Sequence, residues 1–180
     1  IRVNVPDSYR FGWESDVMVL LTDNVHLNFN TTLSRNKIKH FTEVIADYTN
    51  GFDKVEIAHE NTDISFSPSL TGALGLVYRP IENIEVGWSS KYVGSQYLDN
   101  TSNPNRKLDA YYFHNFRIAG DFKSKYWKSL EISFELRNIF NDLYVSNGYT
   151  YSYIVNDLIT QNFLYPQAGR NWMLGARIGL

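Results

Sequence analysis

The sequence predicts an all-β fold, an antiparallel up-and-down β-barrel whose strands cross a membrane. Three observations support this prediction. Apolar and polar residues alternate along several segments, the connections between those segments are alternately short and long, and aromatic residues make up 16% of the chain. Successive side chains of an extended chain point to opposite sides, so each such segment has one apolar and one polar face. Crossing a bilayer in this way takes about ten residues per strand.

The composition excludes several other classes of protein. No run of about eighteen apolar residues occurs, which excludes a transmembrane helix. The chain has no cysteine, which rules out disulfide bonds and thiolate chemistry. The formal net charge is -2 with scattered Lys and Arg residues, so no basic patch indicates nucleic acid binding. The sequence has no signal peptide, so we expect either a mature chain or a piece of a larger protein.

The first part of the chain contains two alternating segments. Residues 1–10 include a proline and an aspartate and are expected to form a short extended piece that enters a bend. A strand is predicted over residues 11–21 and another over residues 25–33, joined by a tight turn at residues 22–24.

Two polar stretches lack the alternation and are predicted to be loops. Residues 35–65 are rich in charge, and a turn is expected at Asn50 and Gly51. Residues 98–107 centre on the sequence DNTSNPN, which offers almost nothing to a hydrophobic core.

Three further strands are predicted at residues 70–78, 84–92 and 112–118, the last with a less regular pattern. We expect the first of them to stop at a turn formed by Arg79 and Pro80, because proline cannot donate to a central ladder. A turn through residues 120–128 is expected after the third.

The clearest alternation lies in the last fifty residues, at residues 130–137 and 171–180. About thirty Tyr- and Asn-rich residues separate these two strands and are predicted to form an irregular loop, too long for a hairpin turn in a compact soluble domain. The final strand is expected to place its apolar residues on one face: Trp172, Leu174, Ala176, Ile178 and Leu180.

These segments make about seven strands whose connections alternate in length. In a meander, successive connections lie at opposite ends, so all the short turns share one end. Bacterial outer-membrane barrels show this asymmetry, with short periplasmic turns and long extracellular loops. The polar faces are expected to line an aqueous lumen because they carry charge in mid-strand, at Glu14, Asp16, Glu85, Lys91, Glu131, Glu135 and Arg137.

The aromatic residues favour lipid over a soluble core as the environment of the apolar faces. Amphipathic rings are well placed between headgroups and hydrocarbon. Several lie near predicted strand ends on the apolar face: Trp13, Tyr78, Trp88, Tyr92, Phe140 and Trp172. The central part of the four most regular strands has no Lys or Arg on this face, where either would cost about 2–4 kcal/mol.

Three segments carry a resemblance to a known family. RNIFNDLY (137–144) and YPQAGRNWMLGARIGL (165–180) resemble the closing strands of TonB-dependent receptors, and KYVGSQYLDNT (91–101) is similar to a segment frequent in them. The matching positions are Asn138, Ile139, Phe140, Asn141, Tyr144, Tyr165, Pro166, Gly169 and Arg170. The chain departs from the family in ending at Leu180, where a terminal aromatic residue is usual.

The resemblance implies the C-terminal part of a barrel of about 22 strands in the outer membrane of a Gram-negative bacterium. Residues 1–180 would then hold about seven strands, while the N-terminal plug domain and the earlier strands would be absent. Such receptors import scarce solutes, typically iron chelates or cobalamin and in some lineages oligosaccharides. The implied partners are outer-membrane lipid, the small-molecule substrate and the TonB complex, which would be reached through the absent N-terminal region.

No motif indicates an enzyme, a cofactor or a metal site. The four histidines, His26, His40, His59 and His114, share no ligand spacing. Acidic residues in the 35–65 stretch do not follow the EF-hand order, and a solvated loop face is the better interpretation. Glu131 and Glu135 lie on one strand face about 13 Å apart, which favours lumen lining over a glycosidase pair.

The candidate ligand-binding residues lie in the predicted loop between Tyr144 and Tyr165. They are Tyr149, Tyr151, Tyr153 and Phe163. Tyrosine supplies a large, rigid contact area with a polar tip, as an extracellular ligand-binding loop requires. The alternative is that this loop packs on its neighbours.

Two other functions remain open from the sequence. A complete small barrel of about eight strands, acting as a structural protein, adhesin or enzyme, would pair its first strand with its last. A soluble β-sandwich binding module would bury Ile132 and Phe134 between two stacked sheets.

Overall fold

The computed structural model describes residue 5 and residues 7–179, which form strands and connections. The expectations for residues 1–4, Pro6 and Leu180 fall outside the described residues. No helix in the described part of the chain is long and apolar enough to cross a membrane. Residues 7–179 form twelve strands: β1 (Ser8–Thr22), β2 (Val25–Asp47), β3 (Asp53–Asp63), β4 (Leu70–Ile81), β5 (Ile84–Val93), β6 (Gln96–Tyr97), β7 (Lys107–Leu108), β8 (Tyr111–Ser124), β9 (Trp127–Arg137), β10 (Val145–Val155), β11 (Asp157–Pro166) and β12 (Asn171–Gly179).

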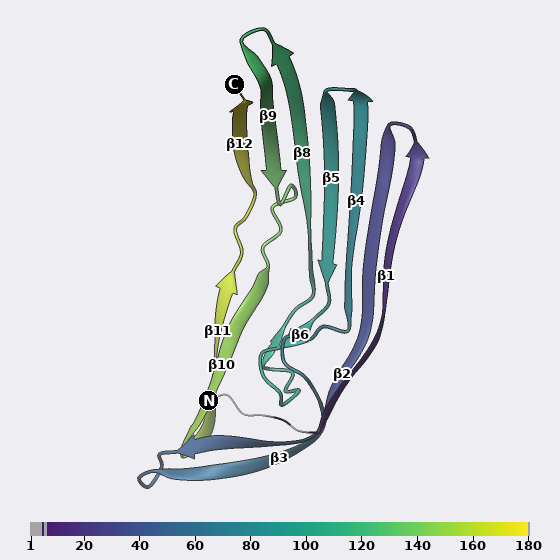
Figure 1. The fold of residues 1–180 in the computed structure, drawn as a ribbon. Coiled ribbons are helices and arrows are strands. Elements are labelled where there is room, and N and C mark those ends of the chain that lie inside the picture. The colour runs from purple at the N-terminus through teal and green to yellow at the C-terminus, as the bar shows by residue number, and fades with distance from the viewer. Residues whose placement is uncertain (1–4, 6, 180) are drawn as a thin grey trace.

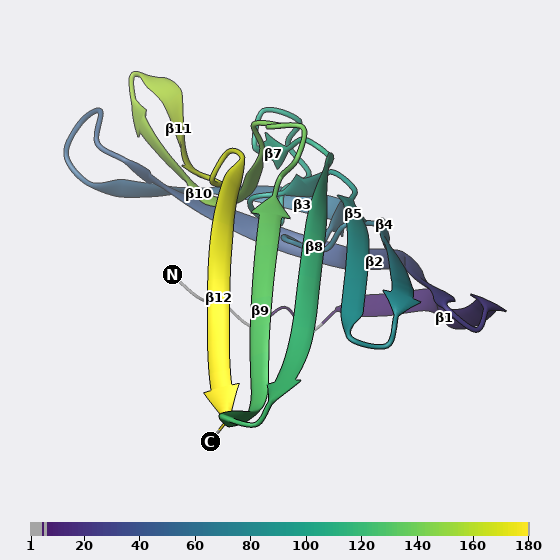
Figure 2. The same ribbon diagram turned by 90° about the horizontal axis from the view of Figure 1, so that it is seen from above.

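Seven of these strands form the antiparallel meander that the sequence predicts, in the order β1, β2, β4, β5, β8, β9 and β12. Figure 2 shows them as one curved wall. Among the described residues β1 pairs with β2 alone and β12 with β9 alone, so the wall is open. A closed small barrel, which would pair these two edge strands, is therefore not formed.

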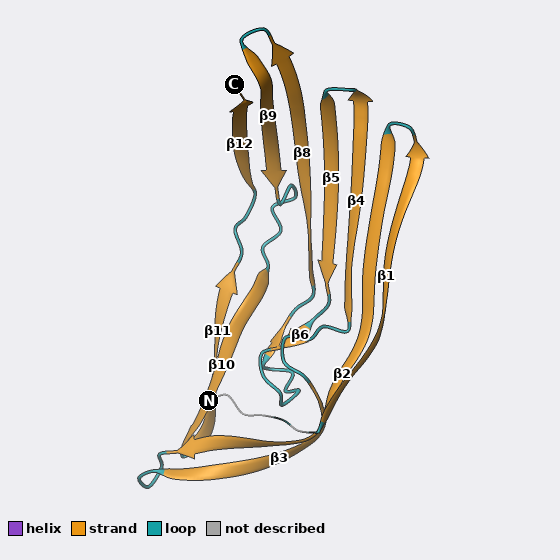
Figure 3. Cartoon of the chain, in the orientation of Figure 1, coloured by secondary structure: helices purple, strands orange, loops and turns teal. Residues whose placement is uncertain are grey.

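The short connections lie together at one end of the wall, with the described C-terminal strand end beside them (Figure 1). They are two-residue turns at residues 23–24, 82–83 and 125–126. The long connections lie at the other end (Figure 3). The alternation of connection lengths is confirmed.

Two strands continue past the positions where the sequence predicts turns. β4 continues through Arg79 and Pro80 to Ile81, and the ladder with β5 shifts register between Tyr78 and Ile81. This irregularity accommodates the proline, which has no N–H to donate. β8 likewise extends through Gly120 to Ser124.

The strand register joins the apolar faces into one continuous surface, which we call the outer face. One row across it runs through Leu76, Trp88, Phe116, Leu136 and Trp172, each paired with the next. Trp172 is 68% exposed and Leu174 is 66% exposed. Ile132 lies on the same face and is 43% exposed, so it is not sealed between stacked sheets. This excludes the β-sandwich.

The opposite face, which we call the inner face, carries a row of cross-strand ion pairs. Arg79 binds Glu85 at 2.8 Å, and Arg117 binds both Glu85 at 3.3 Å and Glu131 at 3.2 Å. Arg177 extends the row to Glu131 at 3.6 Å. Each exposed pair adds little stability, roughly 0–1 kcal/mol. The row shows that the charged residues of the predicted polar faces lie together on the inner face.

The stretch over residues 35–65 is a long hairpin, not a loop. β2 continues to Asp47 and β3 returns beside it, and the two pair over ten positions. The expected turn at Asn50 and Gly51 is confirmed, and Gly51 has φ 115°, a conformation that favours glycine.

The thirty-residue stretch before β12 also contains a hairpin, which the sequence analysis missed. β10 and β11 pair from Val145–Pro166 to Val155–Asp157, with Asn156 at positive φ in the turn. The hairpin reaches back across the sheet, where Tyr153 and Ile154 pair in parallel with Ala46 and Asp47 of β2.

Candidate functional site

Three segments meet at the end of the wall that carries the long connections. They are the β2–β3 hairpin, the β10–β11 hairpin and residues 94–110 with their short strands β6 and β7, which we call the 94–110 loop (Figure 1). The DNTSNPN centre of this loop contributes only Thr101 to the buried residues, but the residues on either side of it are packed against the rest of the molecule. The buried residues of the whole loop are Gly94, Gln96, Leu98, Thr101, Arg106 and Leu108.

Arg106 joins all three segments. Its side chain is 2% exposed and its Nη1 donates to Glu43 of β2 and to Asp99 of its own loop, the latter at 2.8 Å. Its Nη2 donates to Thr160 of β11 at 3.5 Å. Glu43 also contacts His59 of β3 at 3.1 Å. One guanidinium therefore holds two hairpins and a loop together.

The two carboxylates are needed because a buried charge must be compensated. Burial alone would lower the pKa of Arg106, but its hydrogen bonds to Glu43 and Asp99 and the negative charges of these two carboxylates together outweigh burial, and the pKa is raised. Its Nε has no partner among the described residues. Sequence reasoning missed this residue because its partner Glu43 lies 63 positions away.

The four predicted ligand-binding residues lie on one face of the β10–β11 hairpin. Tyr149, Tyr151 and Tyr153 alternate along β10, and Phe163 of β11 pairs with Tyr149. The rings of Tyr149 and Phe163 are stacked, with a centroid distance of 4.7 Å and an interplanar angle of 11°. The ring centroids of Tyr151 and Tyr153 are 5.7 Å apart. Tyr149, Tyr151 and Phe163 are between 41% and 49% exposed.

Two residues that the sequence analysis did not select extend this surface. The ring centroid of Tyr165 lies 6.2 Å from that of Tyr149. It is two positions after Phe163, so strand periodicity could have identified it. Tyr48, which follows β2, forms a hydrogen bond with Tyr151 that raises the pKa of Tyr151. We call Tyr48, Tyr149, Tyr151, Tyr153, Phe163 and Tyr165 the aromatic surface.

The other face of the hairpin packs on the 94–110 loop. Thr160 reaches Arg106, and Asn162 Nδ2 donates to the carbonyl of Asn105 at 2.7 Å. Because successive side chains alternate, these contacts leave the aromatic surface on the side that faces away from the loop. The hairpin thus packs on its neighbours through one face and exposes tyrosines on the other.

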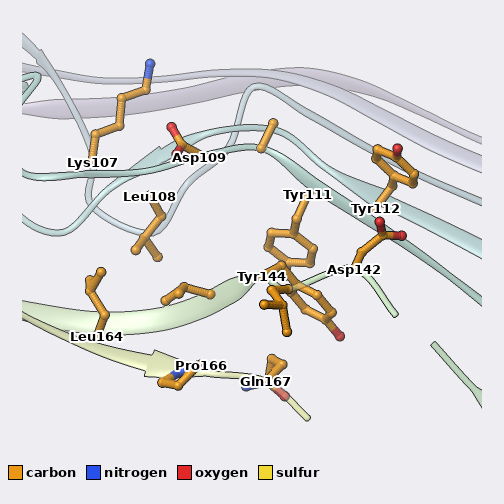
Figure 4. Close-up of a pocket in the computed structure, with 13 residues that line it drawn as sticks. Lys107, Leu108, Asp109, Tyr111, Tyr112, Asp142, Tyr144, Leu164, Pro166 and Gln167 are labelled. Carbon is orange, nitrogen blue, oxygen red and sulfur yellow. The ribbon is translucent and has the colours of Figure 1, made fainter. Parts of the chain in front are cut away.

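A hollow of about 470 Å³ lies between the 94–110 loop and the start of β10 (Figure 4). Tyr111 and Tyr144 stack at 4.6 Å and 17° in its wall, and Tyr144 also stacks on Phe113 at 5.5 Å. Asp142 lines it as well, and its Oδ2 has no hydrogen-bond partner among the described residues.

The RNIFNDLY segment forms a rigid turn between β9 and the β10–β11 hairpin. Asn138 is 4% exposed, and its Nδ2 donates to the carbonyls of Asp142 at 2.9 Å and Ala168 at 3.3 Å. Asn141 Oδ1 accepts from the Arg170 N–H at 2.8 Å. A Cβ at Gly169 would lie 2.7 Å from that oxygen. These residues tie the end of β9 to the start of β12, which is a structural role.

In the described residues, no group of three or more His, Cys, Asp or Glu side chains is arranged to hold a metal ion. Glu131 and Glu135, predicted to line the lumen, both lie on the inner face. Each is paired with arginine: Glu131 with Arg117 and Arg177, and Glu135 with Arg137 at 2.6 Å.

Comparisons with protein-family models and with curated proteins give no match. Solved structures do match in fold. The chain is similar to the siderophore receptor PiuA from Acinetobacter baumannii, with a TM-score of 0.70 and 12% identity over 94% of this chain and 21% of that chain. It is also similar to the ferric-catecholate import receptor Fiu from E. coli K12, with a TM-score of 0.61 and 16% identity over 94% of this chain and 20% of that chain.

A third similar structure is the ferric citrate transporter FecA, with a TM-score of 0.53 and 17% identity over 93% of this chain and 31% of that chain. The chain spans about a fifth to a third of the length of these three structures. At such low identities the likeness is one of fold. The chain therefore has the fold of a portion of a TonB-dependent receptor barrel, as the resemblance in its sequence implied.

Proposed function

We propose that the chain is the C-terminal barrel portion of a TonB-dependent receptor in the outer membrane of a Gram-negative bacterium. The receptor imports a scarce solute, for which an iron–siderophore chelate is the first candidate and cobalamin the second. The proteins named above as siderophore, ferric-catecholate and ferric citrate receptors favour the iron chelate. Such a protein is a transporter and not an enzyme.

The observation that carries this proposal is the two-sided wall. Its outer face is a continuous, exposed apolar surface, and its inner face holds the charged row from Arg79 to Arg177. In water such a continuous apolar surface would cause the protein to aggregate, which single exposed apolar residues do not. In a bilayer the same surface is stabilised by contact with hydrocarbon. The open edges at β1 and β12 must be paired in lipid, so further strands would complete the barrel.

The aromatic surface supports the proposal that the β10–β11 hairpin contacts the solute. Exposed, mutually stacked rings on a hairpin fixed through its other face give a rigid contact area at low entropic cost. Tyr149, Tyr151, Tyr153 and Phe163 are the residues that we assign to binding, together with Tyr165.

Uptake by cells with and without the complete gene tests the function. Under iron limitation, radiolabelled ferric siderophores of catecholate, hydroxamate and carboxylate type are offered in parallel with labelled cobalamin and an oligosaccharide. We expect gene-dependent accumulation of at least one ferric chelate, abolished when tonB is deleted. Uptake of cobalamin or the oligosaccharide instead would refute only the preferred substrate class. Absence of gene-dependent uptake for every solute would refute transport.

A further inference from the structure

The turn between β8 and β9 differs in charge from the other two short turns of the wall. It carries Lys123, Lys125 and Lys128, and all three lysines are exposed. The turns at residues 23–24 and 82–83 contain an acidic residue each and no lysine or arginine. The β8–β9 turn lies with them at the end of the wall that holds the short connections (Figure 1). It is therefore the basic one of these three turns.

The positive charge of this turn is not compensated within the described chain. Asp121, the one acidic residue in the stretch 121–128, lies opposite Glu131 on the inner face. Glu131 in turn is bound by Arg117 at 3.2 Å. Lys125 Nζ lies 4.9 Å from the centroid of the Tyr126 ring, a contact that supplies no carboxylate. None of the three lysines forms an ion pair with a described residue, so their charges are free to attract an anion.

The apolar band of the outer face ends next to these lysines. On β8 the outer face runs from Tyr112 to Phe122, which are about ten residues apart. At about 3.3 Å per residue and a strand tilt of about 40°, this stretch spans about 25 Å of membrane thickness. An outer-membrane barrel has an apolar band of this height, bordered on both sides by aromatic residues. Phe122 therefore marks the level at which hydrocarbon gives way to headgroups.

Trp127 supports the position of this boundary. Its Nε1–H donates to the carbonyl of Phe122 at 3.2 Å, so the indole lies at the end of the hairpin. Indole rings are enriched at the level of the headgroups. Lys123 directly follows Phe122, and Lys128 directly follows Trp127. Because the lysine stem is long and apolar, it can lie along the apolar surface while the ammonium group stays among the headgroups.

We propose that the β8–β9 turn binds an anionic phospholipid of the periplasmic leaflet, whose phosphate is held by the three lysines and whose acyl chains lie along Phe122 and Leu130. The inference rests on the proposed function, which puts the short turns on the periplasmic side. The periplasmic leaflet of such a membrane consists of glycerophospholipids, some of them anionic. A zwitterionic lipid is held less tightly, because its own ammonium group repels the lysines. Each lysine near an anionic membrane surface strengthens the attraction about fivefold.

Brominated lipids test this surface locally, because bromine quenches a fluorophore only at short range. The chain has no cysteine, so one cysteine at position 178, opposite Leu130 and 57% exposed in the native residue, can carry a bimane label in the complete protein. In vesicles, brominated phosphatidylglycerol or brominated phosphatidylethanolamine competes with an unbrominated lipid. We expect this label to report a preference of at least about fivefold for phosphatidylglycerol. A label at position 19, on the outer face near the turn that holds Asp23, should report none.

Variants assign the preference to the lysines. The double variant Lys125→Gln with Lys128→Gln should lose most of the preference for phosphatidylglycerol at position 178. The double variant Lys125→Arg with Lys128→Arg, which keeps both charges, should retain it. The matched control is Lys54→Gln, an exposed lysine of the β2–β3 hairpin at the opposite end of the wall, which should change nothing.

Equal quenching by the two lipids at position 178, or an unchanged preference in the glutamine double variant, would overturn the lipid site. The same preference at position 19 would show a general attraction of anionic lipid to the protein and would overturn it as well. So would a label at position 178 that neither lipid quenches, because another protein would then cover this surface. If the protein is extracted only by detergent in these cases, the proposed membrane location still stands. Extraction in plain buffer would instead overturn the proposed function itself.

Discussion

Arg106 and Glu43 form a buried ion pair between two segments that are 63 residues apart in the chain. Asp99 completes the pairing of the guanidinium, and the three side chains are 2%, 14% and 25% exposed. The 94–110 loop is thereby fixed to the β2–β3 hairpin, and through Thr160 to the hairpin that carries the aromatic surface.

Arg106→Met should loosen this end of the molecule. It removes the positive charge that Glu43 and Asp99 share, and breaking a buried ion pair costs about 3–5 kcal/mol. We expect the two hairpins to become sensitive to limited proteolysis and their amide protons to exchange faster, while the barrel strands remain protected. Arg177→Met is the matched control, since Arg177 is 84% exposed and its pair with Glu131 should contribute little. Proteolysis that is the same in both variants would contradict this role.

Truncation of the aromatic surface should weaken solute binding. Tyr149→Ala and Phe163→Ala each remove one partner of the stacked pair, and loss of a central aromatic contact typically costs about 2 kcal/mol or more. We expect the Kd for the imported chelate, measured by titration of the purified protein, to rise at least about tenfold. Tyr126→Ala provides the comparison, because Tyr126 is 71% exposed in a short turn at the opposite end. Unchanged affinity in both aromatic variants would remove these residues from the site.

A positive charge introduced on β12 should destabilise the barrel when it is on the outer face and have little effect when it is on the inner face. Leu174 lies on the outer face opposite Phe134, and its neighbour Met173 lies on the inner face opposite Glu135. Leu174→Arg should destabilise the folded barrel in lipid by about 2–4 kcal/mol, whereas Met173→Arg should be nearly neutral. Denaturant titrations in lipid vesicles would measure both. A larger penalty at Met173 would reverse the assignment of the faces.

Asn138 should be sensitive to a change that preserves its size. Asn138→Asp keeps the shape and the tolerance of positive φ, at which Asn138 sits with φ 52°, but removes the Nδ2 donor to Asp142 and Ala168. The resulting buried acceptors lose their partners, which costs about 1–3 kcal/mol. The expected result is a lower Tm in detergent. Asn147→Asp serves as the control, because the Asn147 side chain accepts from the Gly148 N–H through its oxygen, which the substitution retains. Equal Tm values for the two variants would contradict the structural role of the motif.

The seven barrel strands could be predicted from the sequence because each has one apolar outer face and one polar inner face. Ile132 and Phe134 of β9 lie on the outer face and Glu131 and Glu135 on the inner face, so apolar and polar residues alternate strictly there. In the second half of β2 this contrast is lost. Glu43 and Ile45 share a face, yet one binds Arg106 and the other is 1% exposed. Alternation therefore disappears although the strand continues, and the sequence of residues 35–65 predicts a loop where the structure has a hairpin.

The sequence singles out Tyr149, Tyr151, Tyr153 and Phe163 by residue type alone, as aromatic residues of a predicted loop. Their place on one face of a hairpin follows from the pairing of β10 with β11, which the sequence analysis does not predict. The contribution of Tyr48 could not be predicted, because this residue joins the aromatic surface only through the parallel pairing of β10 with the end of β2. The burial of Arg106 could not be predicted from the sequence either. An arginine in a polar stretch is usually solvated, and only the meeting of three distant segments buries this one.

Spin labelling tests the assignment of the two faces most directly. The chain has no cysteine, so single cysteines at positions 74, 116 and 174 on the outer face and 75, 117 and 175 on the inner face can be labelled one at a time in the complete protein. In lipid vesicles, labels at the first three positions should be relaxed by oxygen, which concentrates in hydrocarbon, and labels at the other three by a water-soluble nickel complex. Relaxation by the nickel complex at positions 74, 116 and 174 would contradict the account.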